Sequence, residues 1–100
     1  MKALIDNLSK AFESRVRLAA MSVLMVNDAM DFSSLKELLQ VTDGNLATHM
    51  AVLEREGYIR VHKRFIGKKP QTTYSATASG KAAFADHVDA LEQLIRTGRQ

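Results

Sequence analysis

The sequence predicts a mainly α-helical single domain that carries one β-hairpin. Apolar residues recur every three or four positions over most of the chain, which is the period of amphipathic helices. Between Ile59 and Phe65 the period changes to two, the pattern of a strand with one solvent-exposed face. The chain has 100 residues, of which 46% are hydrophobic and 25% are charged. That size and balance fit one globular domain over residues 1–100.

Two helices are predicted in the first quarter of the chain. Leu4, Leu8 and Phe12 recur at four-residue spacing, which predicts a short amphipathic helix over about residues 2–12. Residues 14–26 are apolar over well more than half of their helical surface, so they predict the central helix of the core. Propensity does not decide whether these two helices are separate or continuous, and we expect a kink between them.

A short helix and a turn follow. Ser33 and Ser34 offer hydroxyls that can cap a helix over Leu35–Gln40. After a turn of three or four residues, Thr42 or Asp43 can cap the next helix in the same way. The sequence therefore predicts two helices joined by a tight turn.

The second helix of this pair, over about residues 43–56, has one face that belongs in the core. Its large apolar residues recur at i, i+4 and i+7: Leu46, Met50 and Leu53. Gly57 is a natural left-handed residue to end the helix. Gly44 near its start costs up to about 1 kcal/mol relative to alanine, so we expect something to approach the backbone closely there.

The hairpin is predicted from residue 59 onward. Gly67–Pro70 makes its turn, and Gln71–Ala76 is the returning strand. We expect Ile66, beside the turn, to pack under the hairpin; the alternative is that it reaches the wall of a groove in a bound partner. Residues 57–85 contain six basic residues and no acidic one, whereas the rest of the chain is net acidic and the whole carries +3. Such a basic segment attracts a polyanion, although many basic segments are only solvated surface.

The spaced series of these segments resembles one family. The segments are Phe32–Leu39, Thr42–Met50, Leu53–Ile59, Gly67–Thr72 and Thr77–Lys81, within roughly residues 14–85. In order and spacing they resemble the small winged-helix transcriptional regulators of the MarR/ArsR-like type. The resemblance implies a winged helix-turn-helix with extra N- and C-terminal helices, and a regulator, most often a repressor, that binds double-stranded DNA sequence-specifically.

In that family the second helix of the pair lies in the major groove, and the hairpin, or wing, contacts the phosphate backbone or minor groove. The candidate DNA-binding residues on the helix are Gly44, Asn45, Thr48, His49 and Arg55. Those on the hairpin are Lys63, Arg64, Lys68 and Lys69. An asparagine can donate and accept at an adenine edge, while lysines and arginines on phosphates add strength and salt dependence. The alternative is that Asn45 and Thr48 only solvate or cap their helix.

Both terminal helices carry apolar stripes that a compact winged helix does not need. The first stripe is Leu4, Ile5, Leu8 and Phe12, and the second, on a helix over about residues 78–96 capped by Thr77, is Phe84, Val88, Leu91, Leu94 and Ile95. We expect these helices to pair across a homodimer, which would set two reading helices about 34 Å apart. The alternative is that they pack on each other within one chain.

Several classes of function are not expected. The chain has no cysteine, so there is no disulfide framework or thiol nucleophile, and its histidines lack the spacing of a metal site: His49, His62 and His87. The trio Asp86, His87 and Asp89 is interpreted as a solvated helical face. Because Ser22 lies on an apolar helix and no oxyanion-hole or phosphate loop is visible, we expect no enzyme and no cofactor.

The expected setting is the cytoplasm, without a membrane partner, because the longest apolar stretch is too short to span a bilayer. No pattern identifies a small-molecule effector. A competing interpretation is a winged-helix protein-interaction module that binds an acidic partner, since one fold can serve both uses. A polar helix face and a basic hairpin on the same side of the molecule favour DNA.

Overall fold

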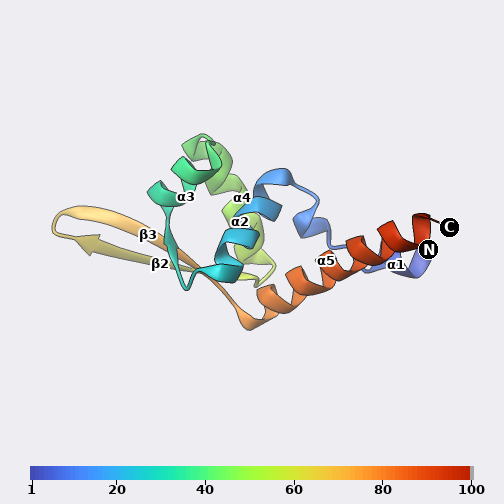
Figure 1. The fold of residues 1–100 in the computed structure, drawn as a ribbon. Coiled ribbons are helices and arrows are strands. Elements are labelled where there is room, and N and C mark those ends of the chain that lie inside the picture. The colour runs from blue at the N-terminus through green and yellow to red at the C-terminus, as the bar shows by residue number, and fades with distance from the viewer. Residues whose placement is uncertain (100) are drawn as a thin grey trace.

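Helix α2 (Arg15–Val26) is the centre of the fold, as its apolar sequence predicts (Figure 1). In the computed structural model, which describes residues 1–99, Ala20, Met21 and Leu24 on this helix are at most 1% exposed. The elements follow in the order α1 (Lys2–Asp6), the 3₁₀ helix η1 (Lys10–Phe12), α2, β1 (Met30–Asp31), α3 (Phe32–Leu39), α4 (Asp43–Arg55), β2 (Ile59–Ile66), β3 (Lys69–Ala76) and α5 (Ala78–Gly98). Buried side chains of α3, α4 and the sheet close around α2: Leu35, Leu46, Met50, Leu53, Ile59 and Tyr74.

The molecule is elongated, with two projections on opposite sides of this core. Its extents are 58 × 25 × 21 Å and its radius of gyration is 15.1 Å, compared with about 13 Å for a compact chain of this length. The β2–β3 hairpin projects at one end, and α5 projects at the other with α1 beside it (Figure 1). The N-terminus and the last turn of α5 both lie at the helical projection (Figure 1). Within residues 1–99 no helix combines the length and apolar character needed to cross a membrane.

The sheet has three antiparallel strands in the order β1-β3-β2. Strand β1 is only two residues long and was not predicted, because two residues show no period; it forms by pairing Met30 with Tyr74. The predicted turn was too long: only Gly67 and Lys68 lie outside the strands. Gly67 has φ +62, which suits the first position of a two-residue hairpin loop. Pro70 belongs to β3, opposite Phe65.

The helix caps confirm two predictions and correct one. The hydroxyl of Thr42 accepts the backbone N–H of Asn45 in α4, and the hydroxyl of Thr77 accepts that of Gly80 in α5. The prediction that Ser33 or Ser34 caps α3 was wrong, because the helix begins at Phe32 and its cap is Asp31. The Asp31 carboxylate accepts from the Ser34 hydroxyl at 2.6 Å and from the Ser34 N–H at 3.0 Å, and these bonds lower the pKa of Asp31.

The N-terminal segment differs from the predicted kinked helix. Helix α1 ends at Asp6, and the chain then turns through η1, which carries Phe12 into the core. Phe12 is 2% exposed, and its ring centroid lies 5.5 Å from that of Tyr58 and 5.4 Å from that of Phe84. Phe12 therefore belongs to the core of one chain and is not available for the predicted dimer interface. The half-buried Phe84 serves mainly the same cluster.

Two further residues lie elsewhere than expected. His87 is 4% exposed and not part of a solvated face, because the chain before η1 covers it: Nδ1 of His87 accepts the backbone N–H of Ser9 at 2.9 Å. Ile66 does not pack under the hairpin. It is 54% exposed and lines an open hollow together with Phe32 and Ser33 of α3.

Candidate nucleic-acid interface

One face of α4 is open to solvent. The opposite face of α4 packs in the core, and its three large apolar residues are each at most 1% exposed: Leu46, Met50 and Leu53. At 3.6 residues per turn, the exposed residues Gly44, Thr48 and Arg55 lie within about 30° of the opposite direction. Asn45 is exposed too, but it lies about 75° from that direction, at the margin of the open face.

The start of α4 is fixed by contacts with the preceding turn and with α3. The hydroxyl of Thr42 accepts the backbone N–H of Asn45 at 3.1 Å, so the cap uses the backbone of Asn45 and not its amide group. Asp43 forms an ion pair with Lys36 of α3 at 2.7 Å. The turn begins with Gln40 in the left-handed conformation, at φ 54. These contacts set the position of α4 relative to α3, as in a helix-turn-helix.

His49 is not a free residue of the exposed face, contrary to expectation. Its Nδ1 lies 2.9 Å from Nη1 of Arg17 and 3.5 Å from the hydroxyl of Ser14, so the ring is turned toward α2 and is half-buried. Burial and then the charge of Arg17 lower the pKa of His49. A neutral ring whose Nδ1 accepts from Arg17 fits this arrangement, and the contact links α4 to α2.

The alternation of side chains along the hairpin divides its cations between two faces. Lys63 lies on the face toward α4, where it lines the space between them. Arg64 lies on the other face, and its Nε donates to Oε1 of Gln71 at 3.1 Å. Lys69 shares the face of Arg64, and Lys68 lies in the loop. The sequence predicted these four cations as one group, but only Lys63 faces the helix directly.

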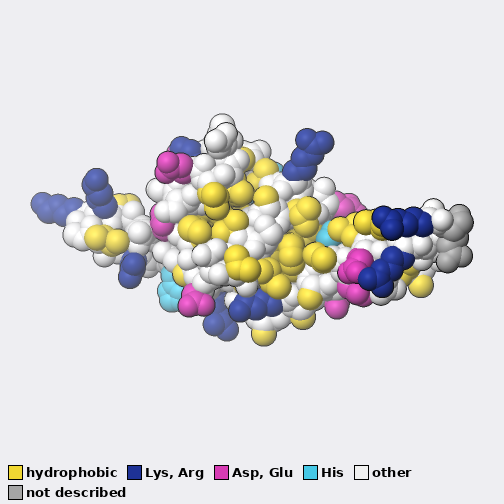
Figure 2. Space-filling view, in the orientation of Figure 1, with side chains coloured by type: hydrophobic (Ala, Val, Ile, Leu, Met, Phe, Trp, Pro, Cys, Tyr) yellow, Lys and Arg dark blue, Asp and Glu magenta, His cyan; other side chains and the backbone are white. Residues whose placement is uncertain are grey.

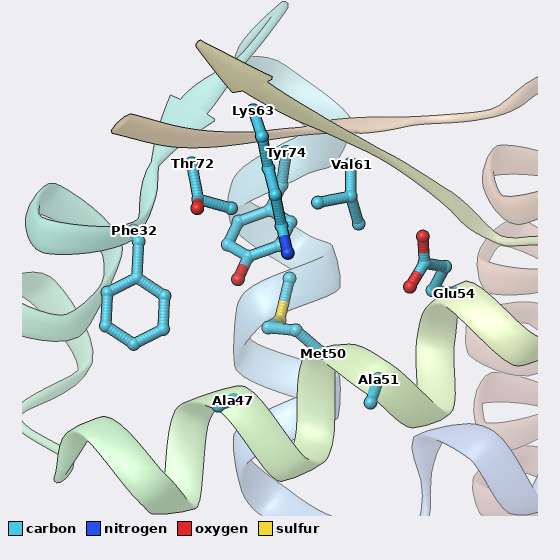
Figure 3. Close-up of a pocket in the computed structure, with 9 residues that line it drawn as sticks. All are labelled: Phe32, Ala47, Met50, Ala51, Glu54, Val61, Lys63, Thr72 and Tyr74. Atoms are coloured by element: carbon cyan, nitrogen blue, oxygen red, sulfur yellow. The ribbon is translucent and has the colours of Figure 1, made fainter. Parts of the chain in front are cut away.

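A cleft of about 520 Å³ lies between α4 and the hairpin (Figure 3). Its lining residues come from α3, α4 and both long strands: Phe32, Ala47, Met50, Ala51, Glu54, Val61, Lys63, Thr72 and Tyr74. Figure 3 shows Lys63 reaching from β2 into the space above α4. The sequence analysis missed Ala47 and Ala51, whose small side chains leave the cleft open. Their helical spacing around Met50 was the signal that could have found them.

Two polar residues of the cleft also escaped the sequence analysis. Burial, followed by the charge of Glu54, raises the pKa of Tyr74, so its hydroxyl stays protonated and can donate a hydrogen bond. Glu54 carries a negative charge that repels phosphate. A nucleic-acid backbone would therefore meet the cleft at Lys63 and not at Glu54.

The outer part of the hairpin is strongly basic. Lys63, Arg64, Lys68 and Lys69, which we call the wing cations, are all exposed, and no ion pair among residues 1–99 includes any of them. Figure 2 shows Lys and Arg side chains standing out around this end of the molecule. Cations without acidic partners are available to bind phosphates.

In the same described residues, no three His, Asp or Glu side chains gather as a metal site would require.

The comparisons with known proteins agree with this geometry. Residues 16–95 match the family described as winged helix DNA-binding domain. The chain is 34% identical over 87 residues to the uncharacterised protein MJ0432 of Methanocaldococcus jannaschii, and the match covers 87% of this chain and 95% of that protein. The sequence-based resemblance to winged-helix proteins is thereby confirmed.

Solved structures show the same fold. A transcriptional regulator homologue from Pyrococcus horikoshii superimposes with a TM-score of 0.87 at 30% identity, over 97% of each chain. The S. aureus protein MepR, solved in complex with DNA, gives a TM-score of 0.73 at 17% identity, over 99% of this chain and 82% of that one. Regulators of the MarR and ArsR families share the fold at 21% and 19% identity.

Proposed function

This chain belongs to the winged helix DNA-binding domain family, and on that premise we propose that it is a homodimeric transcriptional regulator that binds double-stranded DNA sequence-specifically. The observation that carries the proposal is that Lys63 of the hairpin shares a cleft with Ala47 and Ala51 of α4, and these alanines lie on the same helix as the exposed residues Thr48 and Arg55. A polar helix face and a basic ribbon on one side of a molecule suit a major groove and the phosphates beside it. The resemblance to MarR/ArsR-like proteins supports repression, and the expected location is the cytoplasm.

In this proposal α4 enters the major groove. Thr48 lies near the middle of the open face and contacts a base edge, where its methyl group suits the methyl of thymine. Asn45, at the margin, bonds to an adenine edge. Gly44 allows the start of α4 to approach a phosphate. Arg55, at the C-terminal end of α4, binds the DNA backbone. The MepR complex with DNA supports this use of the fold.

The homodimer is proposed from the helical projection. Four apolar side chains on α1 and α5 remain exposed, at 54%, 43%, 38% and 58%: Ile5, Val88, Leu91 and Ile95. Leu4, Leu8 and Leu94 beside them are half-buried. A second copy would cover this surface, and two-fold pairing would present two α4 helices to successive major grooves of a pseudo-palindromic site.

The test is selection of bound duplexes from a pool of random sequence. We expect one enriched motif with two related half-sites. Asn45→Ala should reduce binding to the selected duplex by about 1–3 kcal/mol and leave binding to random duplex nearly unchanged, since a base contact carries the sequence preference. Asn7→Ala, at the far end of the molecule, is the matched control.

Two outcomes would contradict the proposal. Enrichment of no motif would remove sequence-specific recognition. Equal losses on selected and random duplex for Asn45→Ala would remove its assigned role. Binding to an acidic protein in preference to any duplex would favour the interaction-module alternative instead.

A further inference from the structure

The tip of the hairpin exposes two large apolar side chains. Phe65 is 73% exposed and Ile66 is 54% exposed, and both lie at the end of β2. Phe65 lies opposite Pro70 on the face that is turned toward α4 further down the hairpin, and Ile66 lies opposite Lys69 on the other face. Fully burying one such side chain would stabilise a protein by about 1.5–3 kcal/mol. Their exposure therefore does not serve the stability of this chain.

Phe65 and the loop extend beyond the cleft beside α4, while Ile66 and Pro70 line a second hollow with Phe32 at the start of α3. Lys63 still lines the cleft beside α4, whereas Phe65 is two residues further out and the loop two more. At about 3.3 Å per strand residue, the tip reaches roughly 10 Å past Lys63. The major groove is about 12 Å wide, so a wing beside a helix in that groove reaches the neighbouring minor groove.

Charge selects among the possible partners of this apolar tip. The wing cations surround it, and no acidic residue occurs between Gly57 and Ala85. The same view that shows the cations shows apolar atoms between them at this end (Figure 2). A second copy of the hairpin would be repelled. The partner should therefore offer negative charge to the wing cations and an apolar environment to Phe65 and Ile66. Duplex DNA does both, because its phosphates lie outside and its stacked bases inside.

We propose that Phe65, with Pro70 beside it on the same face, is an apolar wedge that enters the minor groove and partly unstacks one base step. Lys68 and Lys69 hold the phosphates on either side of it. Phenylalanine, isoleucine and proline are among the side chains that kink DNA in this way, by about 20–90° toward the major groove. The inference rests on the proposed function, because it needs a wing that is bound to duplex DNA.

The wedge gives the wing a part in sequence choice as well as in strength. Pyrimidine–purine steps such as TA and CA unstack most easily. We therefore expect a preferred flexible step on each flank of the selected motif, outside the bases that α4 contacts.

The experiment uses the full chain and the duplex recovered from the random pool, with 2-aminopurine replacing single adenines along both flanks. The fluorescence of 2-aminopurine increases when the base is unstacked. The protein should raise its fluorescence at one step per flank, and energy transfer between end labels should report a bend. Phe65→Ala with Ile66→Ala should abolish both signals and weaken binding about tenfold, the loss expected from one apolar side chain. Val26→Ala, an exposed apolar residue on α2, is the matched control and should change neither signal.

The outcomes separate the wedge from the proposed function. If the protein binds the selected duplex without unstacking or bending it, and the double variant binds equally well, the wedge is overturned while DNA binding stands. If the protein binds no duplex, both are overturned. If the double variant loses binding to anionic lipid vesicles but keeps unstacking DNA, the tip serves a membrane surface and the inference is wrong.

Discussion

Gly80 is the residue at which the fold has no room for a side chain. A Cβ atom there would lie 2.1 Å from the carbonyl oxygen of Tyr58 and 2.9 Å from Cε of Met21. The Tyr58 oxygen cannot move freely, because it accepts the backbone N–H of Thr77 at 3.0 Å. Close approach of α5 to the segment before β2 therefore depends on a glycine in the first turn of that helix.

Gly80→Ala is expected to destabilise the protein by about 3 kcal/mol or more, because a backbone clash forces the two segments apart. Gly44→Ala is the control: it lies in a helix, nothing lies within 4 Å of its Cβ position, and it should stabilise by about 0.4–1 kcal/mol. Urea denaturation measures both. Equal stabilities for the two variants would show that the contact at Gly80 relaxes at no cost.

His49 predicts a pH dependence of stability. Because its folded pKa is lowered, the folded state favours the neutral ring, so the contribution of His49 is complete above its ordinary pKa of 6.5 and is lost as the pH falls below that value. The Tm should fall more between pH 7.5 and 5.5 for the wild type than for His49→Gln. His62→Gln, at an exposed histidine, should keep the wild-type dependence. Equal pH profiles for wild type and His49→Gln would contradict this.

At the scale of elements, the helix caps show which helix starts can be predicted from local sequence. Thr42 and Thr77 were predictable because each is a good capping residue that precedes an apolar helical period, Thr42 by one turn and Thr77 by about two. Asp31 was missed because it belongs both to a two-residue strand and to the cap of α3, and the strand exists only where β3 supplies its partner. Local patterns thus find helix starts, but not those that follow tertiary strand pairing.

The hairpin predicts a measurable salt effect. Lys68→Ala with Lys69→Ala should weaken binding to selected and random duplexes alike and reduce the slope of log K against log salt by about 2, since each phosphate contact contributes about 0.9. Lys2→Ala with Lys10→Ala removes the same charge from the opposite end and should leave the slope nearly unchanged. Equal slopes for both double variants would show that only net charge matters.

At the scale of the whole molecule, the exposed apolar side chains of the helical projection predict a dimer. Ile5→Glu with Ile95→Glu changes two side chains that are 54% and 58% exposed, so it should cost the isolated chain little stability and convert dimer to monomer. Sedimentation over a concentration series measures this. Val26→Glu, at a residue 84% exposed on α2, should stay dimeric. A wild type that sediments as monomer at tens of micromolar, with and without DNA, would contradict the dimer.

Phe12→Ala separates core from interface within the same N-terminal stripe. Because Phe12 packs on Tyr58 and Phe84 inside one chain, its truncation should destabilise folding by about 3–5 kcal/mol. Thermal unfolding of Phe12→Ala measures this loss. If Phe12→Ala instead gave a folded monomer with unchanged Tm, Phe12 would belong to the dimer interface and not to the core.

The sequence by itself determined the core helix α2, the helices α3 to α5, the hairpin and their order, because each depends on a local period or on a turn residue such as Gly57, whose positive φ suits glycine. It also determined the open face of α4, because three buried residues at helical spacing leave one side free. Only the tertiary structure decided which residues predicted to face solvent or a partner make contacts within the chain. His49 contacts Arg17, His87 accepts from Ser9, and Phe12 packs in the core. Those contacts join residues 32 to 78 positions apart, or depend on an irregular turn, and no local period records them.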